Sequence, residues 1–123
     1  MFKERCMFLE SREKAIKIAE ILRSKKASDI EVLDIGKITI IADCFVICTG
    51  NSTTQVEALA NEILEKMNEA GEKELRVEGL RGGGWILIDF GNVIVHIFKR
   101  ETREFYGLEH LWGDAEKLEF DTE

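Results

Sequence analysis

Two segments of the chain place apolar residues at the three- and four-residue spacing of an amphipathic helix. Ser11 is the predicted cap of the first helix, whose apolar positions are Ala15, Ile18, Ala19 and Leu22. Ser52 and Gln55 form a capping-box pattern that opens the second helix. This helix should end at Gly71, because glycine readily adopts the left-handed conformation that terminates helices.

Continuous or alternating apolar runs predict the strands of one sheet. Residues 30–35, 43–49 and 74–78 predict three strands, and the second of these is almost wholly apolar, as in a strand buried on both faces. Gly91 and Asn92 separate two further apolar runs, which predicts a hairpin with a two-residue turn. A short helix is expected at 101–108. The elements predict an α/β domain, a single mixed sheet of about five strands with helices mainly on one face.

The hairpin register follows from pairing Phe90 with Val93. One face is then wholly apolar and should join the core; it carries Ile86, Ile88, Phe90, Val93, Val95 and Ile97. The other face is mixed; it carries Trp85, Leu87, Asp89, Ile94, His96 and Phe98. Such a mixture of large apolar and polar residues is typical of a protein-binding surface, and Trp85 is its strongest contact candidate.

Length and charge bound the remaining possibilities. The 123 residues suit one domain, which we place at 11–115, after a loosely ordered segment at 1–10 and before an acidic tail at 116–123. The net charge of −7 opposes recognition of phosphate backbones and suits a basic protein partner. No apolar run reaches the roughly 18 residues that span a bilayer, and no secretory signal is present. We therefore expect a cytoplasmic protein without membrane contact.

Candidate metal, phosphate and catalytic groups are incomplete. Cys44 and Cys48 lie in an apolar run and should be buried reduced thiols, since zinc sites need closely paired cysteines or histidines. The turn at 50–52 lacks both the further glycines of a dinucleotide loop and the lysine of a P-loop. Asp89 and His96 could form an acid–base pair, but no nucleophile is evident beside them. A structural or partner contact is the favoured interpretation, with no metal and no cofactor.

Several ordered motifs together resemble the ribosomal silencing factor (Iojap-related) family. They occupy residues 43–50 with Ser52, then 78–79, 84–91, 95–98, 103–106 and 108–112. The resemblance implies a fold similar to nucleotidyltransferases without their catalytic carboxylates. It also implies a translational repressor, not an enzyme, that binds the fourteenth protein of the large ribosomal subunit. Such a factor blocks joining of the small subunit under nutrient limitation and can form homodimers.

On this resemblance, the expected partner-binding residues are apolar anchors and acceptors for arginine or lysine. They are Trp85 and Tyr106 with Leu108 and Leu111 beside them, and the acceptors Asp89 and Glu109. Gly107 departs from the family, which usually has aspartate there, and His110 replaces a basic residue. Two alternatives stay open: a nucleotide-binding or nucleotidyl-transferring enzyme, and a self-associating scaffold without ribosome contact.

Overall fold

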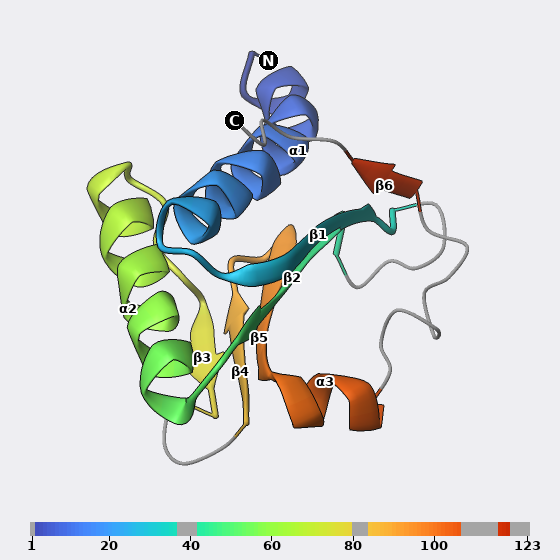
Figure 1. The fold of residues 1–123 in the computed structure, drawn as a ribbon. Helices are drawn as coiled ribbons and strands as arrows, with labels where there is room; N and C mark the ends of the chain where they lie inside the picture. The colour runs from blue at the N-terminus through green and yellow to red at the C-terminus, as the bar shows by residue number, and fades with distance from the viewer. Residues whose placement is uncertain (1, 37–41, 80–83, 107–115, 119–123) are drawn as a thin grey trace.

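The chain folds around one six-stranded mixed sheet, seen edge-on in Figure 1. The computed structural model describes residues 2–36, 42–79, 84–106 and 116–118, with side chains placed from residue 11 and, in the last helix, up to residue 103. The strands are β1 (Ser28–Asp34), β2 (Cys44–Gly50), β3 (Arg76–Glu78), β4 (Trp85–Asp89), β5 (Val93–Lys99) and β6 (Glu116–Leu118). Their order is β3-β4-β5-β2-β1-β6, and only the β2–β5 pair is parallel. The predicted fold class is confirmed, with one strand more than expected.

Helix α1 (Phe2–Ser24) begins well before the predicted cap at Ser11. Residues 2–10 contain no glycine or proline, so their sequence has nothing to interrupt a helix. The segment expected to be loosely ordered is therefore helical from Phe2. Ser11 is buried inside the helix, and its hydroxyl donates to Asp43 Oδ2 at 2.6 Å instead of capping. This bond ties α1 to the residue that precedes β2.

Helix α2 (Thr53–Glu69) begins and ends where predicted. Ser52 Oγ accepts the N–H of Gln55 at 3.1 Å, while Gln55 Oε1 accepts the N–H of Asn51 at 2.6 Å. The glutamine thus reaches one residue further back than in a standard capping box. At the other end, Gly71 has φ +85°, the left-handed conformation expected of it.

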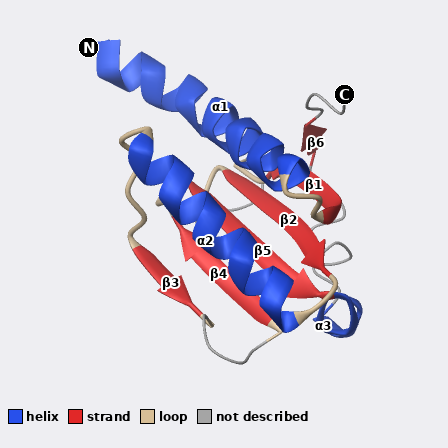
Figure 2. Cartoon of the chain, turned by 60° about the vertical axis from the view of Figure 1, so that its left-hand side comes forward, coloured by secondary structure: helices blue, strands red, loops and turns tan. Residues whose placement is uncertain are grey.

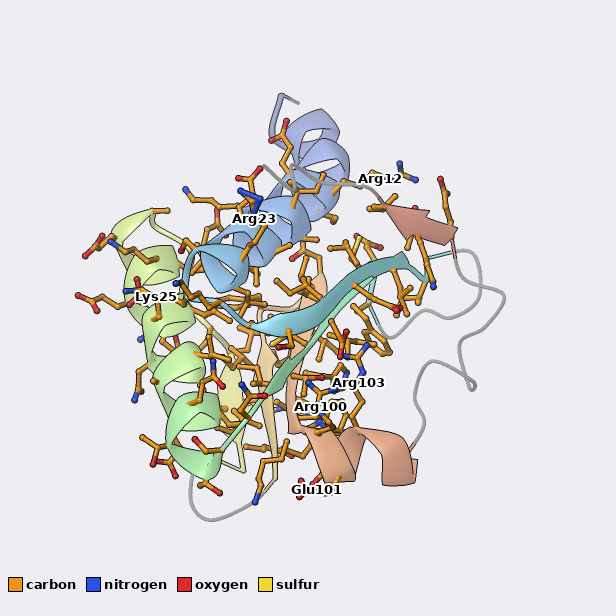
Figure 3. All side chains as sticks on the ribbon, in the orientation of Figure 1. Arg12, Arg23, Lys25, Arg100, Glu101 and Arg103 are labelled. Carbon is orange, nitrogen blue, oxygen red and sulfur yellow. The ribbon has the colours of Figure 1, made fainter. Side chains whose placement is uncertain are left out.

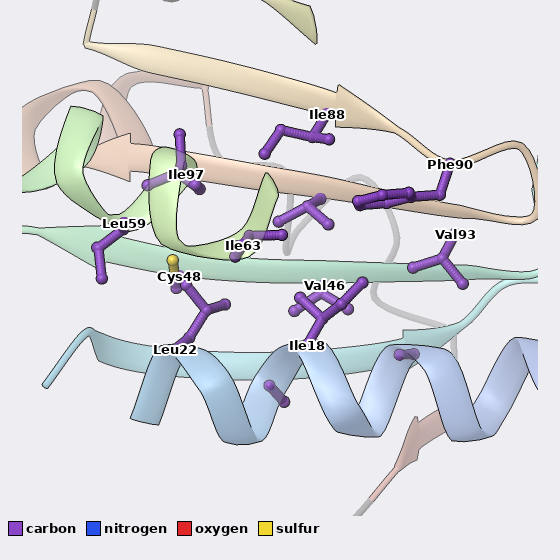
Figure 4. Packing of buried hydrophobic residues seen from close by; sticks show 14 of the residues in the cluster. Ile18, Leu22, Val46, Cys48, Leu59, Ile63, Ile88, Phe90, Val93 and Ile97 are labelled. Atoms are coloured by element: carbon purple, nitrogen blue, oxygen red, sulfur yellow. The ribbon is translucent and has the colours of Figure 1, made fainter. Parts of the chain in front are cut away.

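The main core lies between the sheet and the two long helices, which pack on the same face (Figure 2). Figure 4 shows Ile18 and Leu22 of α1 and Ile63 of α2 directed toward the buried side of β2 and β5. The predicted apolar face of the hairpin is buried in this cluster, and all five β4–β5 pairs have the predicted register. Cys44 and Cys48 are free thiols in the same core, where burial raises the pKa of each to about 12.

Strand β6 lies where the sequence predicts only an acidic tail. It pairs antiparallel with β1 and forms that edge of the sheet. Arg12 of α1 contacts Asp34 of β1 and lies 3.7 Å from Glu116 of β6. Charge contacts and backbone pairing therefore place this strand, although it has no apolar pattern of its own. None of the helices in the described part of the chain combines the length and apolarity needed to cross a bilayer.

Candidate protein-docking face

The sheet face turned away from α1 and α2 carries a second apolar cluster. Its buried members come from β1, β2 and β5 and from the residues that follow β1 and precede β2, and two half-buried residues of β4 pack against them. The cluster consists of Leu33, Ile35, Ala42, Phe45, Ile47, Ile94 and Phe98, with Trp85 and Leu87 of β4. Helix α3 (Arg100–Tyr106) lies beside the end of β5 on this side (Figure 1). We call the group Phe45, Trp85, His96 and Phe98 the aromatic face. Three of these residues belong to the mixed hairpin face predicted to bind a partner, and Phe45 extends that face onto β2.

Burial on this face differs sharply between neighbouring strands. Ile94, His96 and Phe98 of β5 are buried, more than the prediction of a partly solvated face implied. On β4 the residues of the same face, Trp85 and Asp89, are half-buried. Leu87 lies between them in the same row and is also half-buried, so it belongs with the candidate contact residues. Period-two alternation placed Leu87 on this face, but only the burial of β5 shows that β4 provides the accessible row.

The rings of the aromatic face pack against one another across the strands. Trp85 and Phe98 are cross-strand partners, and their ring centroids are 5.0 Å apart at an interplanar angle of 28°. Phe45 meets His96 nearly perpendicularly, with centroids 4.7 Å apart. Trp85 Nε1 donates a hydrogen bond to His96 Nδ1 at 3.1 Å. Ring stacking and this hydrogen bond together restrain the indole of Trp85.

The hydrogen bond from Trp85 determines which ring nitrogen of neutral His96 carries the proton. Because Nδ1 accepts, the neutral imidazole must carry its proton on Nε2. Nε2 is buried, and no hydrogen-bond partner for it occurs among the described residues. Burial also lowers the pKa of His96 to about 4, so the ring is uncharged at neutral pH. His96 therefore serves as a hydrogen-bond acceptor for Trp85. Neither ring nitrogen is accessible for acid–base chemistry, because Nδ1 accepts from Trp85 and Nε2 is buried.

Asp89 makes its contacts away from His96. Its Oδ1 accepts the N–H of Gly91 at 2.7 Å, and its Oδ2 lies 3.4 Å from Arg76 Nε of β3. The side chain is 18% exposed, so part of the carboxylate stays accessible beside Arg76. Within the described part of the chain no hydrogen bond or ion pair joins Asp89 to His96, so the possible acid–base pair is not formed. The prediction that Asp89 accepts a partner's cation stays a prediction.

Arg103 anchors α3 to the sheet. Its Nη1 donates to the backbone oxygen of Asp29 at 2.6 Å and to Thr49 Oγ1 at 2.8 Å. Its Nη2 lies 3.9 Å from Glu31 Oε2, and the guanidinium is buried. Arg100 from the same helix reaches the Asp29 carboxylate at 3.1 Å. Figure 3 labels both arginines where α3 meets the sheet. The sequence interpretation gave Arg103 no role, because nothing in a seven-residue helix pattern shows which strands it meets.

The remaining predicted contact residues lie at the end of α3 and after it. Tyr106 is the last residue of that helix, and its side chain lies outside the described part of the structure. Leu108, Glu109 and Leu111 also lie outside the described residues. The structure thus brings Trp85 and Asp89 into one row on β4. Their spatial relation to the other four predicted residues stays a prediction.

Phosphate and metal chemistry have little support at the strand-to-helix turn. Ser52 Oγ is used in capping α2, and a Cβ on Gly50 would lie 2.8 Å from Val56 Cγ2, which explains the glycine by packing. Within the described residues, no three His, Cys, Asp or Glu side chains are grouped as metal ligands.

Comparison with known proteins identifies the family. Residues 9–123 match the family described as "Ribosomal silencing factor during starvation". The chain belongs to the ribosomal silencing factor (Iojap-related) family. It is 44% identical over 97 residues to ribosomal silencing factor RsfS of Bacillus subtilis (strain 168), covering 79% of this chain and 82% of that protein. The family name describes a regulatory protein of the ribosome rather than an enzyme.

Two further relatives support the family fold and its range. A crystal structure of a protein from Chromobacterium violaceum superposes with a TM-score of 0.78 at 38% identity, covering 88% of this chain and 90% of that one. "Mitochondrial assembly of ribosomal large subunit protein 1" of Mus musculus is 31% identical over 98 residues, covering 77% of this chain and 43% of that protein. The likeness to the Chromobacterium violaceum structure supports the fold over most of the chain.

Proposed function

We propose that this chain binds the large ribosomal subunit through that subunit's fourteenth protein and sterically blocks joining of the small subunit. Translation is thereby lowered under nutrient limitation. Membership of the silencing factor family supports this role, and the name of the mouse relative associates that protein with the large subunit. The observation that carries the docking proposal is the half-buried β4 row, Trp85, Leu87 and Asp89, set on a rigid aromatic face.

The chemistry of this row suits a protein surface. An indole and a leucine side chain supply apolar area at little rotamer cost, and tryptophan is enriched among residues that dominate binding energy. Asp89 beside them can accept a cation from the partner in addition to Arg76. The net charge of −7 favours encounter with a basic surface and disfavours bare RNA. Steric occlusion needs no bond-breaking step, so we propose a binding factor without catalysis.

The proposed site of action is the cytoplasm, where ribosomal subunits join. The free protein is also expected to self-associate, as the family resemblance implies, and light scattering measures this before ribosomal subunits are added.

Cosedimentation with purified large subunits tests the proposal. The protein is mixed with large subunits at two salt concentrations, and small subunits are added afterwards. We expect stoichiometric binding, fewer joined ribosomes, and weaker binding at high salt because exposed charges are screened. Trp85→Ala should weaken binding about 30-fold, the loss typical of a dominant interface residue.

Leu75→Ala is the matched control. Leu75 is a large apolar residue, 72% exposed, that precedes β3 outside the aromatic face. This variant should bind as the unmodified chain does. Absence of binding at low salt by a folded protein would refute the proposal. Equal losses in the two variants would show that the β4 row is not the docking surface.

A further inference from the structure

The indole of Trp85 is held by two neighbours on the strand beside it. Phe98 stacks against its ring, and His96 accepts its N–H. Both neighbours are buried, whereas Trp85 is half-buried. A half-buried tryptophan can satisfy its N–H with water by rotating, so the hydrogen bond to His96 selects one orientation of the ring.

Packing alone does not account for a histidine at position 96. The ring lies among aromatic side chains, and a phenylalanine would fill a similar volume without any polar atom. The imidazole instead leaves Nε2 buried with no described partner, which is unfavourable. The described polar contact of this ring is the one made by Nδ1 with Trp85. The use of histidine is therefore better explained by Trp85 than by core stability.

We infer that His96 is a positioning residue, whose Nδ1 fixes the orientation of the Trp85 indole on the aromatic face before a partner binds. This inference rests on the proposed docking function of Trp85. It also specifies the partner's chemistry, because the indole N–H already has an internal acceptor. Trp85 then contacts the partner with its ring, which suits an aliphatic side chain or a stacked arginine guanidinium and not a hydrogen-bond acceptor.

Two substitutions separate positioning from packing because they have opposite effects. His96→Phe keeps an aromatic ring in the cluster and removes the buried Nε2, but it has no acceptor for Trp85. His96→Asn loses ring volume, but its Oδ1 is an acceptor bonded to Cγ, as Nδ1 is in histidine. If His96 serves packing, His96→Phe should be more stable than His96→Asn and should bind the large subunit at least as tightly. If it positions Trp85, His96→Asn should bind better although it is the less stable variant.

The test uses the full-length chain, purified large subunits and two readouts. The indole N–H resonance of Trp85, assigned with Trp85→Phe, reports the hydrogen bond by its chemical shift and solvent exchange. We expect a protected resonance in the unmodified chain and in His96→Asn, and rapid exchange in His96→Phe. Affinity for the large subunit should fall about three- to tenfold in His96→Phe, the cost of ordering one freed side chain on binding. It should stay within about twofold in His96→Asn.

The outcomes distinguish failure of this inference from failure of the proposed function. If the unmodified chain binds and His96→Phe binds equally well, positioning by His96 is refuted while docking through the β4 row survives. An unchanged, protected indole resonance in His96→Phe refutes the inference without reference to ribosomes. If the unmodified chain does not bind large subunits, the proposed function fails, and the positioning role fails with it.

Discussion

Replacing Arg103 with alanine should break the contact between α3 and the sheet. The free energy of unfolding should fall strongly as a result. The side chain is buried and donates to the Asp29 carbonyl at 2.6 Å and to buried Thr49 Oγ1 at 2.8 Å. Removing the guanidinium leaves both acceptors without this donor and takes a cation from beside Glu31. Breaking a buried charged contact from one side costs about 3–5 kcal/mol. The melting temperature should fall by roughly 10–20 °C.

Arg100→Ala is the control for this prediction. Arg100 lies on the same helix and contacts the carboxylate of the same residue, Asp29, but both side chains are more than half exposed. A solvent-exposed ion pair contributes at most about 1 kcal/mol, so this variant should unfold at nearly the urea concentration of the unmodified chain. Urea unfolding followed by circular dichroism measures both variants. Equal midpoints for the two variants would refute the argument that Arg103 anchors α3 through desolvated hydrogen bonds.

Three further predictions concern the core and its polar contacts. Burial holds the pKa of His96 near 4 in the folded chain, against 6.5 for an unperturbed group, so the unfolded chain binds a proton first as pH falls. Stability is thus lost between pH 6.5 and 4, by about 3 kcal/mol, and urea unfolding at pH 7 and 4.5 should show this loss reduced in His96→Phe. Gly50→Ala places a Cβ 2.8 Å from Val56 Cγ2 and should cost about 1–3 kcal/mol in thermal melts. Gly36→Ala, whose nearest contact would be 3.5 Å, should cost much less. Ser11→Ala removes the hydroxyl that links α1 to the start of β2 and to the β4–β5 turn, and an unfolding free energy lowered by about 1–2 kcal/mol is expected; no change would show that water replaces the hydroxyl.

The sequence patterns predicted the structure correctly where it depends on residues that are close together in the chain. The register of the hairpin follows from the Gly91-Asn92 turn and strict alternation, since a slip of one residue would expose the core face. The ends of α2 follow from Ser52 and Gly71, whose backbone roles are local. The almost wholly apolar β2 was correctly expected to be buried on both faces.

The sequence patterns did not predict contacts between segments that are far apart in the chain. Strand β6 is placed by pairing with β1 and by the contact of Glu116 with Arg12 of α1, not by an apolar pattern of its own. Asp89 was expected near His96 because both lie on one face, but Arg76 of β3 and the turn N–H of Gly91 bind its carboxylate. The position of β3 beside β4 decides that outcome, and no local pattern contains it. The predicted register places Trp85 and His96 on the same face of the hairpin, but it does not show that the indole N–H donates to the imidazole.

The burial gradient across the aromatic face limits where a partner can bind. Strand β2 is buried along its whole length, and β5 is buried from Val93 to Phe98, so neither offers side-chain surface. On β4 the alternation leaves the row Trp85, Leu87 and Asp89 half-buried. Any partner of this face must therefore contact the row on β4 first, while the rings of β5 and β2 serve as its rigid support. On the positioning role inferred for His96, an ordered Trp85 reduces the ordering cost of binding, and this gain offsets the unfavourable burial of the imidazole.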